Sequence, residues 1–231
     1  MYIMWDPVVI KKIEPFSLGL GMIKDVKVVK QAENLDQIRK NVFDTVKNEF
    51  NIEGIKDTPV VKAYRKFYWQ YLDIDPTKIR PSGEALARRV LKGQKIPIIN
   101  NIVYSINLAS IQTQLSYSGF DLGKVKSPLE IRYAQQNEAF QGIGTRHRVL
   151  AGNELLLGDA EKILCIYAYG DADATKITAS TKDILLVTYG VPDISTDVLK
   201  NGIENGLKYI QETGGGKIEK IKVSTSAHPE P

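Results

Sequence analysis

Apolar residues recur every three or four positions along five segments of the chain, which is the spacing of an amphipathic helix. Local signals mark the ends of two of these segments. Thr58 followed by Pro59 is a helix N-cap with proline in the first turn, and Gly93 is a left-handed stop after a helix that Ser82 can cap. The pattern predicts helices over residues 34–50, 58–72, 83–92, 98–115 and 195–211.

Short runs of β-branched and apolar residues, bounded by Gly, Pro, Ser and Asp, predict strands. Most of the helices precede residue 115 and most of the strands follow it. We therefore expect an α+β fold, in which a helical cluster of the N-terminal half packs on a mixed or antiparallel sheet. No repeat or linker divides the sequence, so residues 1–231 are expected to form a single domain. The predicted strands cover residues 7–13, 22–30, 129–133, 154–157, 163–169, 184–189 and 217–223.

The charged residues add information about function in only one region of the sequence. The formal net charge of +4 is too small to indicate a nucleic-acid binder unless the basic residues are concentrated in one region. The helix at 83–92 offers such a concentration, because its charged stripe of Glu84, Arg88 and Lys92 is expected to face water or a partner. The sequence contains no run of about 18 apolar residues and no signal-peptide pattern. We therefore expect a cytoplasmic protein that does not enter a membrane.

Catalytic signatures are scarce. The sequence has no Walker A loop, no dinucleotide fingerprint, no Gly-x-Ser-x-Gly elbow and no His-Glu-x-x-His motif. Cys165 is the only cysteine and sits in an apolar run, so it is interpreted as a core residue and a disulfide or thiolate metal site is excluded. His147 is one candidate general base, although a surface loop is the favoured interpretation. We therefore assign no catalytic residue, no metal and no cofactor.

Four polar residues are candidates for a site. Asn100 and Asn107 are two turns apart on the predicted helix, so their amides would point in one direction. A buried amide needs a hydrogen-bond partner, and stapling a loop explains this pair as well as lining a site does. Glu138 and Asp159 follow predicted strands and can orient a water or bind an ammonium group. Acids at strand ends are nevertheless most often turn residues.

A set of motifs extends over most of the chain: Arg80-Pro81-Ser82-x-Glu84-Ala85-Leu86, Lys92-Gly93, Ile96-Pro97-x-x-Asn100, Asn107, Phe120-Asp121, Ile131-Arg132-x-Ala134-x-x-x-Glu138, Asp159 and Thr181. In order and spacing they resemble the B3/4 domain of the phenylalanyl-tRNA synthetase beta subunit, and especially its free-standing relatives. The resemblance implies a B3/4-type editing-domain fold. Its matching core would span residues 64–190, after strands and helices at 1–60 and before a helix and strand at 195–223 and a tail at 224–231.

In that family the domain is an editing module, which hydrolyses tyrosine mischarged on the phenylalanine tRNA in a pocket between its two halves. The sequence departs from the family pattern at several residues. Ser118 replaces a histidine, Tyr104 an aspartate, and Val187 the glutamate that reads the tyrosine hydroxyl, while residues 167–171 replace a double-glycine loop. Because valine cannot accept a hydrogen bond, we expect tyrosine-specific editing to be lost.

Three functions fit these observations. The leading hypothesis is a domain that binds tRNA or aminoacyl-tRNA and hydrolyses a misacylated ester in trans; it is expected neither to be a ligase on its own nor to bind DNA. The second is a module that binds a free amino acid or related metabolite without RNA, and the third is an interaction domain. The residues predicted to bind RNA are Lys78, Arg80, Arg88, Arg89, Lys92 and Lys95, and those predicted to bind in a pocket are Asn100, Asn107, Glu138, Asp159 and Thr181.

Overall fold

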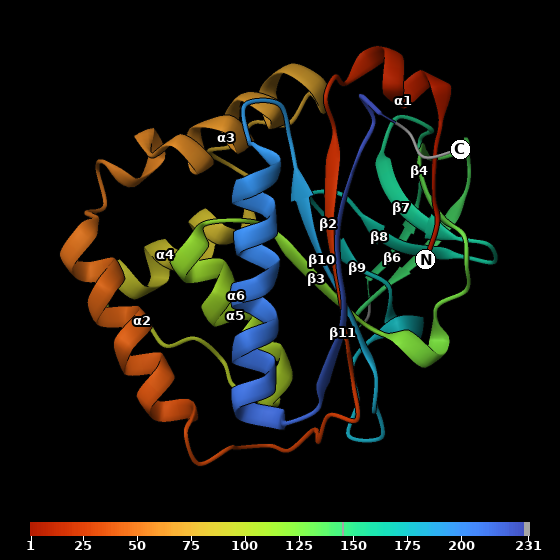
Figure 1. Ribbon diagram of the computed structural model, residues 1–231. Coiled ribbons are helices and arrows are strands. Elements are labelled where there is room, and N and C mark those ends of the chain that lie inside the picture. Colours follow the sequence, from red (N-terminus) through yellow and green to blue (C-terminus); the bar gives the residue numbers. More distant parts are fainter. Residues whose placement is uncertain (145, 229–231) are drawn as a thin grey trace.

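The computed structural model describes residues 1–144 and 146–228. Within them, α-helices and β-strands alternate irregularly along the chain (Figure 1). The helices are α1 (Pro7–Lys12), α2 (Leu35–Glu49), α3 (Pro59–Tyr71), α4 (Ser82–Leu91), α5 (Asn101–Thr113) and α6 (Thr196–Gly214). The strands are β1 (Ile3–Trp5), β2 (Ser17–Lys24), β3 (Tyr117–Asp121), β4 (Leu129–Tyr133), β5 (Ala139–Gly142), β6 (Arg146–Val149), β7 (Leu155–Asp159), β8 (Ile163–Ile166), β9 (Gly170–Asp171), β10 (Ile184–Gly190) and β11 (Lys217–Thr225).

These strands form two sheets and a separate hairpin of β5 and β6. The five-stranded sheet has the order β1-β4-β7-β8-β9 and is mixed, because β1 runs parallel to β4 while the other pairs are antiparallel. The four-stranded sheet has the order β11-β2-β10-β3 and is antiparallel throughout. Its register places Val187 of β10 opposite Ser118 of β3, so these two side chains share one face of the sheet.

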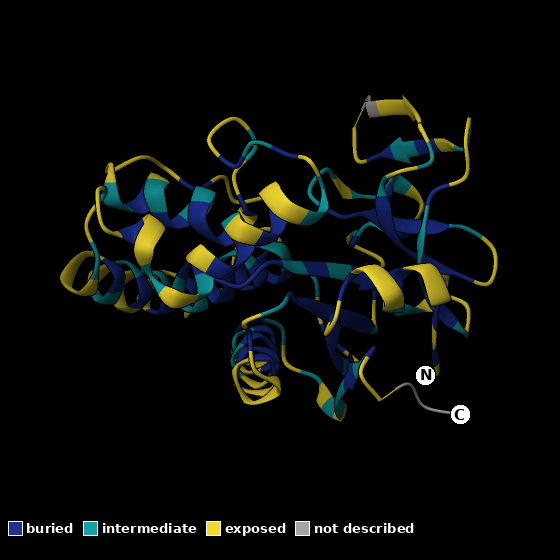
Figure 2. Cartoon of the chain, turned by 90° about the horizontal axis from the view of Figure 1, so that it is seen from above, coloured by how far each residue is buried: buried dark blue, intermediate teal, exposed yellow. Residues whose placement is uncertain are grey.

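Hydrophobic packing joins the sheets and helices into layers. One face of the four-stranded sheet packs on α5 and α6 around Ile102, Ile203 and Leu207 (Figure 1). The opposite face packs on the five-stranded sheet and on the aromatic side of α3, where Phe67 is buried. Helices α2, α4 and α5 form a further cluster, which lies to one side of the sheets (Figure 2). The predicted α+β class, with a helical cluster packed on mixed and antiparallel sheets, is confirmed.

All five predicted helices are present, and their ends lie within a few residues of the prediction. Thr58 is the N-cap of α3 with Pro59 in its first turn. Gly93, just after α4, has a φ of 70°, as expected for a left-handed stop. The predicted cap of α4 is wrong, because Ser82 is its first helical residue and the N-cap position is occupied by Pro81.

Two strand predictions are wrong. Residues 7–13 form α1 instead, because Asp6 accepts a hydrogen bond from the backbone N–H of Val8 and so caps a helix of β-branched residues. The strand predicted at residues 22–30 lies earlier, since β2 ends at Lys24 and Asp25 takes a φ of 58°. In both places β-branched composition alone was ambiguous, and hydrogen bonding decided the conformation.

The end of the chain is more ordered than predicted. Strand β11 continues to Thr225, and the hydroxyl of the buried Ser226 accepts a hydrogen bond from the backbone N–H of Phe16 at 2.9 Å. This contact ties the C-terminal segment to β2. Of the predicted tail at 224–231, residues 229–231 lie outside the described part of the chain.

Candidate functional site

A cleft of about 230 Å³ lies between the two sheets. The four-stranded sheet contributes Ser116, just before β3, together with Ser118 in β3 and Tyr189 in β10. The five-stranded sheet contributes Cys165 in β8 and Asp171 in β9. Further lining comes from four tyrosines and from the residues at the start of α4: Tyr68, Tyr117, Tyr167, Tyr169, Arg80 and Ser82.

Ser118 is the centre of a hydrogen-bond chain in this cleft. Its Oγ donates to Oδ1 of Asp171 at 2.6 Å and accepts from the hydroxyl of Tyr189 at 2.9 Å. Ser118 and Tyr189 are buried, whereas Asp171 is half-buried. Burial raises the pKa of Asp171 from 3.8 to about 6, and hydrogen bonds from Ser118 and Cys165 only partly oppose this rise. The carboxyl group is therefore ionised at neutral pH, although no described lysine or arginine forms an ion pair with it.

Cys165 is buried beside this hydrogen-bond chain. Its Sγ lies 3.8 Å from the Oγ of Ser118. Burial, with a smaller contribution from the charge of Asp171, raises the pKa of the thiol well above its ordinary value. The group is a thiol rather than a reactive thiolate at neutral pH. The interpretation of Cys165 as a core residue is thus confirmed, at a position that also lines the cleft.

Two hydroxyl groups at the cleft have no hydrogen-bond partner among the described residues. They belong to Ser116 and Tyr167, whose residues are 7% and 5% exposed. The neighbouring Tyr64 differs, because its hydroxyl donates to the carbonyl of Tyr189 and accepts from the backbone N–H of Ser116. A buried hydroxyl without a partner costs free energy. Each of these two buried groups therefore has unused hydrogen-bonding capacity beside the cleft.

The five residues predicted to bind in a pocket do not line this cleft. Asn100 is the N-cap of α5, and its side chain accepts from the backbone N–H of Val103 at 2.8 Å. The prediction that it shares a helix face with Asn107 is wrong, because Asn100 precedes the first turn in an extended conformation. Asn107 is half-buried on α5. Thr181 donates to a carboxylate oxygen of Asp121 at 2.8 Å, a contact that joins the segment before β10 to β3.

The two acids of that set also have structural partners. Glu138 accepts hydrogen bonds from Arg132 at 2.7 and 2.9 Å, and this arginine holds the pKa of the carboxyl below its usual range. Asp159 accepts from the backbone N–H groups of Lys126 and Lys162 and is ion-paired with the side chain of Lys162. These contacts are typical of turn residues. Binding by any of the five remains a prediction.

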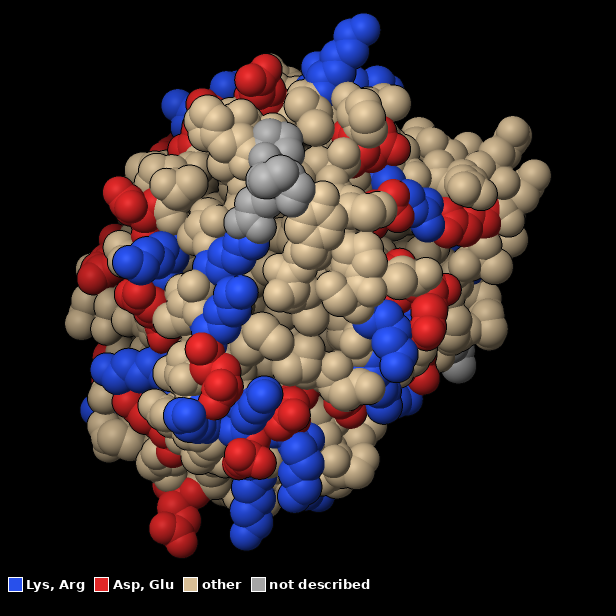
Figure 3. Space-filling model, turned by 45° about the vertical axis from the view of Figure 1, so that its right-hand side comes forward, with Lys and Arg blue, Asp and Glu red and all other residues tan. Residues whose placement is uncertain are grey.

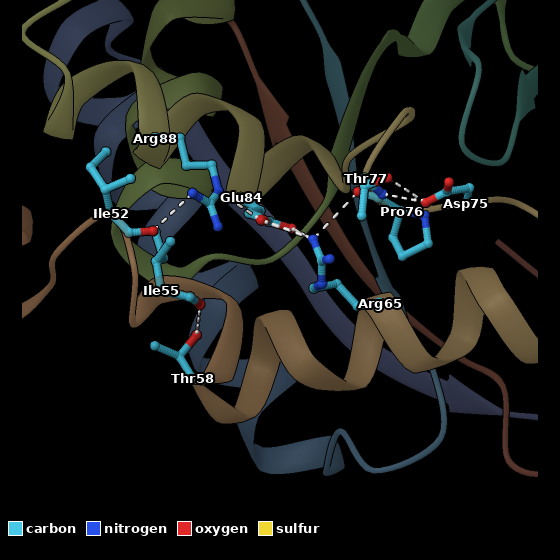
Figure 4. A network of polar contacts seen from close by, with 9 residues as sticks. All are labelled: Ile52, Ile55, Thr58, Arg65, Asp75, Pro76, Thr77, Glu84 and Arg88. Carbon is cyan, nitrogen blue, oxygen red and sulfur yellow. Dashed lines mark hydrogen bonds and ion pairs between the residues drawn. The ribbon is translucent and has the colours of Figure 1, made fainter.

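The charged stripe of α4 is partly structural (Figure 4). Glu84 is fully buried, with Arg88 of the next turn at 2.7 Å and Arg65 of α3 at 3.1 Å. Arg88 also donates to the carbonyl of Ile52 at 2.8 Å. The prediction that this stripe faces water or a partner is therefore wrong for Glu84 and Arg88. The physical reason is that Arg65 reaches the stripe from another helix and neutralises the acid.

The other basic residues of the predicted set lie on the surface. Lys78, Arg80, Arg89, Lys92 and Lys95 are all exposed. Arg89 donates to the carbonyl of Lys95 at 2.9 Å, which holds the loop after α4 against the helix. Arg80 lines the cleft. In sequence order, exposed cations thus occur at the cleft, near the end of α4 and in the loop that follows.

Charges on the face drawn in Figure 3 are mixed in sign. Figure 3 shows a face on which Lys and Arg side chains alternate with Asp and Glu around an area without charges. His147 is exposed on β6 and is not part of the cleft lining. In the described part of the chain, no helix is long and apolar enough to span a membrane, and no group of three or more His, Cys, Asp or Glu is placed to hold a metal ion.

Comparisons with known proteins add an independent finding. A family model described as the B3/4 domain matches residues 63–214. The phenylalanine–tRNA ligase beta subunit of Fusobacterium nucleatum subsp. nucleatum is 31% identical over 121 residues, which are 52% of this chain and 15% of that protein. The same subunit of Haemophilus ducreyi is 25% identical over 166 residues, or 72% of this chain and 20% of that protein. The chain therefore spans about a fifth or less of the length of these curated relatives.

A solved structure is also similar. It is the crystal structure of an N-terminal fragment of the phenylalanyl-tRNA synthetase beta-subunit from Pyrococcus horikoshii. The match has a TM-score of 0.49 and 13% sequence identity, and it covers 94% of this chain and 50% of that chain.

Proposed function

The chain belongs to the B3/4 domain family, and from that premise we propose that it binds the aminoacyl end of tRNA and hydrolyses a misacylated ester in trans, without selecting tyrosine. The curated relatives are beta subunits of a phenylalanine–tRNA ligase, so aminoacyl-tRNA is the substrate class to test first. The observation that carries the proposal is the cleft between the two sheets. The family resemblance implies a pocket between two halves of the domain, and this cleft between the two sheets is our candidate for it.

Two of the departures from the family pattern, Ser118 and the segment 167–171, line this cleft. Ser118, which replaces the family histidine, lines it. Val187, which replaces the tyrosine-reading glutamate, pairs with Ser118 across the sheet and is fully buried. Its side chain has no acceptor for a phenolic hydroxyl. We infer that Asp171 and Tyr189, which line the cleft, take the place of the family acid.

Ester hydrolysis does not require a catalytic triad. A positioned water and hydrogen-bond donors aimed at the developing oxyanion are sufficient to accelerate acyl transfer. The cleft is lined by hydroxyl groups, including those of Ser116 and Tyr167, which have no other partner among the described residues. Its volume of about 230 Å³ suits the aminoacyl group alone, with the nucleotide outside.

The exposed cations from the cleft to the loop after α4 support binding of the RNA backbone. Arg80 lines the cleft, and Lys92 and Lys95 continue the run. Each cation that meets a phosphate contributes affinity that decreases as salt rises, with a slope of about 0.7–0.9 per contact. Replacing Lys92 by Gln is expected to lower the slope of tRNA binding by about that amount. Lys200→Gln, on the exposed side of α6, is the matched control and should leave the slope unchanged.

The decisive experiment for hydrolysis uses a panel of tRNAs charged with different amino acids. We expect at least one ester to decay faster with the purified protein than in the blank. Ser118→Ala should slow that decay by about tenfold or more, because it removes the hydroxyl that joins Asp171 to Tyr189. Ser180→Ala, at an exposed position outside the cleft lining, should not slow it. If no ester decays faster than its blank, the hydrolytic part of the proposal is wrong.

A second candidate function is the binding of a free amino acid or related metabolite without RNA. The unpartnered hydroxyls of Ser116 and Tyr167 favour it, because they are available to a small polar ligand. Bulk tRNA at two salt concentrations separates the two functions. Absence of any salt-dependent tRNA binding would exclude the first and leave the second.

A further inference from the structure

We propose that the cleft between the two sheets binds a primary ammonium group, which Asp171 holds by charge and Ser116 and Tyr167 hold by hydrogen bonds. This inference deepens the proposed function and rests on it for the identity of the ligand as an aminoacyl group or amino acid. It assigns this chain its own recognition residues, at a cleft where the tyrosine-reading acid of the family is absent.

The first observation is the charge of Asp171. Its carboxylate is withdrawn from bulk water, and its side-chain partners are the hydroxyl of Ser118 at 2.6 Å and the thiol of Cys165. The titratable groups that face it from the neighbouring strands are Cys165 and Tyr189, and both are uncharged at neutral pH because burial raises the pKa of each. A withdrawn carboxylate without a counter-ion favours a cationic ligand.

The described basic side chains near the cleft either have other partners or lie at the edge of the cleft, so none of them forms an ion pair with Asp171. Arg148 stacks on the ring of Tyr169, with its guanidinium carbon 4.3 Å from the ring centroid. Lys176 is ion-paired with Asp173 at 2.8 Å. Arg80 is exposed where it lines the cleft, so it is placed to meet a carboxylate or phosphate on the same ligand. Asp171 and Arg80 together therefore suit a ligand that carries an ammonium group beside an acidic group.

The second observation is the pair of unpartnered hydroxyls. An ammonium group has three N–H donors, and a carboxylate can accept only some of them in one geometry. The oxygen atoms of Ser116 and Tyr167 are buried at the same cleft and accept no hydrogen bond from any described residue. An ammonium ligand offers donors to both hydroxyls and a counter-charge to the carboxylate, whereas an apolar ligand offers neither.

The third observation is the aromatic lining. The ring of Tyr167 packs edge-on against Tyr189 at 5.0 Å and against Tyr68 at 6.0 Å. Tyrosine rings attract cations through the negative potential of their faces, and Tyr169 already binds a guanidinium in this way. Tyrosine rings beside the carboxylate of Asp171 therefore favour a cationic ligand.

The ammonium group can be the α-ammonium of an amino acid or the ammonium of a side chain. Calorimetry with small probes, in the absence of RNA, distinguishes these two sources. Phenylalanine carries an α-ammonium only, N-α-acetyl-lysine carries a side-chain ammonium only, and N-acetylphenylalanine carries neither. We expect one or both of the first two to bind and the third to bind at least tenfold more weakly. Equal binding of phenylalanine and N-acetylphenylalanine, without binding of N-α-acetyl-lysine, would overturn the proposal.

The dependence on pH tests the role of the carboxylate. Burial raises the pKa of Asp171 to about 6, so the group is about nine-tenths ionised at pH 7 and about one-tenth at pH 5. Affinity for the ammonium probe should therefore fall about tenfold between these values. Asp171→Asn should bind about tenfold more weakly at pH 7 and lose the pH dependence. Asp197→Asn, at an exposed acid of α6 outside the cleft lining, is the matched control and should behave like the unmodified chain.

Tyr167→Phe provides a variant whose folding is not at risk, because the deleted hydroxyl has no partner among the described residues. It should weaken ammonium binding by about fivefold, which is the effect of one hydrogen bond. Unchanged affinity in both Asp171→Asn and Tyr167→Phe would place the ammonium elsewhere and overturn the proposal. If the ammonium probe binds but no charged tRNA decays, this inference stands and hydrolysis is rejected. If a charged tRNA decays but no ammonium probe binds, hydrolysis stands and this inference is rejected.

Discussion

Glu84 and Asp171 are two acids that the fold withdraws from water in opposite ways. Glu84 is fully buried, and it is held between Arg65 and Arg88 at 3.1 and 2.7 Å (Figure 4). Asp171 is half-buried in the cleft between the two sheets, and its partners are the uncharged side chains of Ser118 and Cys165. One acid is neutralised inside the fold, and the other is left with its charge.

This difference separates a structural acid from the acid that we propose for ligand recognition. A buried acid with two arginines joins α3 to α4, and nothing remains of its charge for a ligand to use. An acid whose charge is uncompensated is costly to the folded state, and such groups concentrate at functional sites. The comparison predicts opposite consequences when each acid is replaced by its uncharged amide.

The largest effect is expected at Glu84. Glu84→Gln leaves Arg65 and Arg88 without their counter-ion, and breaking a buried pair in this way costs about 3–5 kcal/mol of the free energy of unfolding. Urea denaturation measures this loss. Glu204→Gln is the control, because Glu204 contacts Lys200 only at 4.0 Å on the exposed side of α6 and should cost less than about 0.5 kcal/mol. A loss below about 1 kcal/mol at Glu84 would contradict the structural role assigned to it.

Asp171→Asn is expected to have the opposite sign. The folded-state pKa of about 6 lies above the ordinary 3.8, so the native state binds the proton more tightly than the unfolded chain. Stability is therefore lost as pH rises from about 4 through 6, by about 1–3 kcal/mol in total. The variant should be more stable than the unmodified chain at pH 7 and equal to it at pH 4. Thermal melts at both pH values test this, and a less stable variant at pH 7 would show that the charge has a partner.

The smallest effect concerns two buried tyrosines. Tyr64→Phe removes a hydroxyl that bonds the carbonyl of Tyr189 and the backbone N–H of Ser116, and it should cost about 1–2 kcal/mol. Tyr167→Phe removes a hydroxyl without a partner among the described residues and should be neutral or stabilising. Urea denaturation of the two variants in parallel measures the difference. Equal losses of unfolding free energy in the two variants would show that the hydroxyl of Tyr167 has a hydrogen-bond partner in the folded protein.

Much of the fold was predictable because the signals are local. The pairs Thr58-Pro59 and Lys92-Gly93 mark helix ends through interactions with neighbours a few residues away. The spacing of the motifs between Arg80 and Thr181 also anticipated the family that the comparisons identified. The errors arose where local signals conflict, as at residues 7–13, which form α1 although their composition favours a strand.

The candidate site was far less predictable. The sequence departures at Ser118 and Val187 point to a changed pocket, but they do not reveal what replaces the lost acid. Asp171 was noticed only as the end of the segment that replaces a double-glycine loop, because no local pattern marks it. Asn100 and Asp159, two of the residues predicted to bind in a pocket, hold a helix start and a turn, which is the structural alternative that the sequence left open.

The sequence by itself determined the five longer helices and the family, because each depends on residues close along the chain or on spacings that can be read without coordinates. Only the tertiary structure decided which acid is neutralised and which is left charged. Arg65 reaches Glu84 from 19 residues away on another helix, and Ser118 reaches Asp171 from 53 residues away on another sheet. Whether an acid is neutralised depends on which side chains lie near it in the folded protein, because the strength of an ion pair depends on distance and burial rather than on order in the chain.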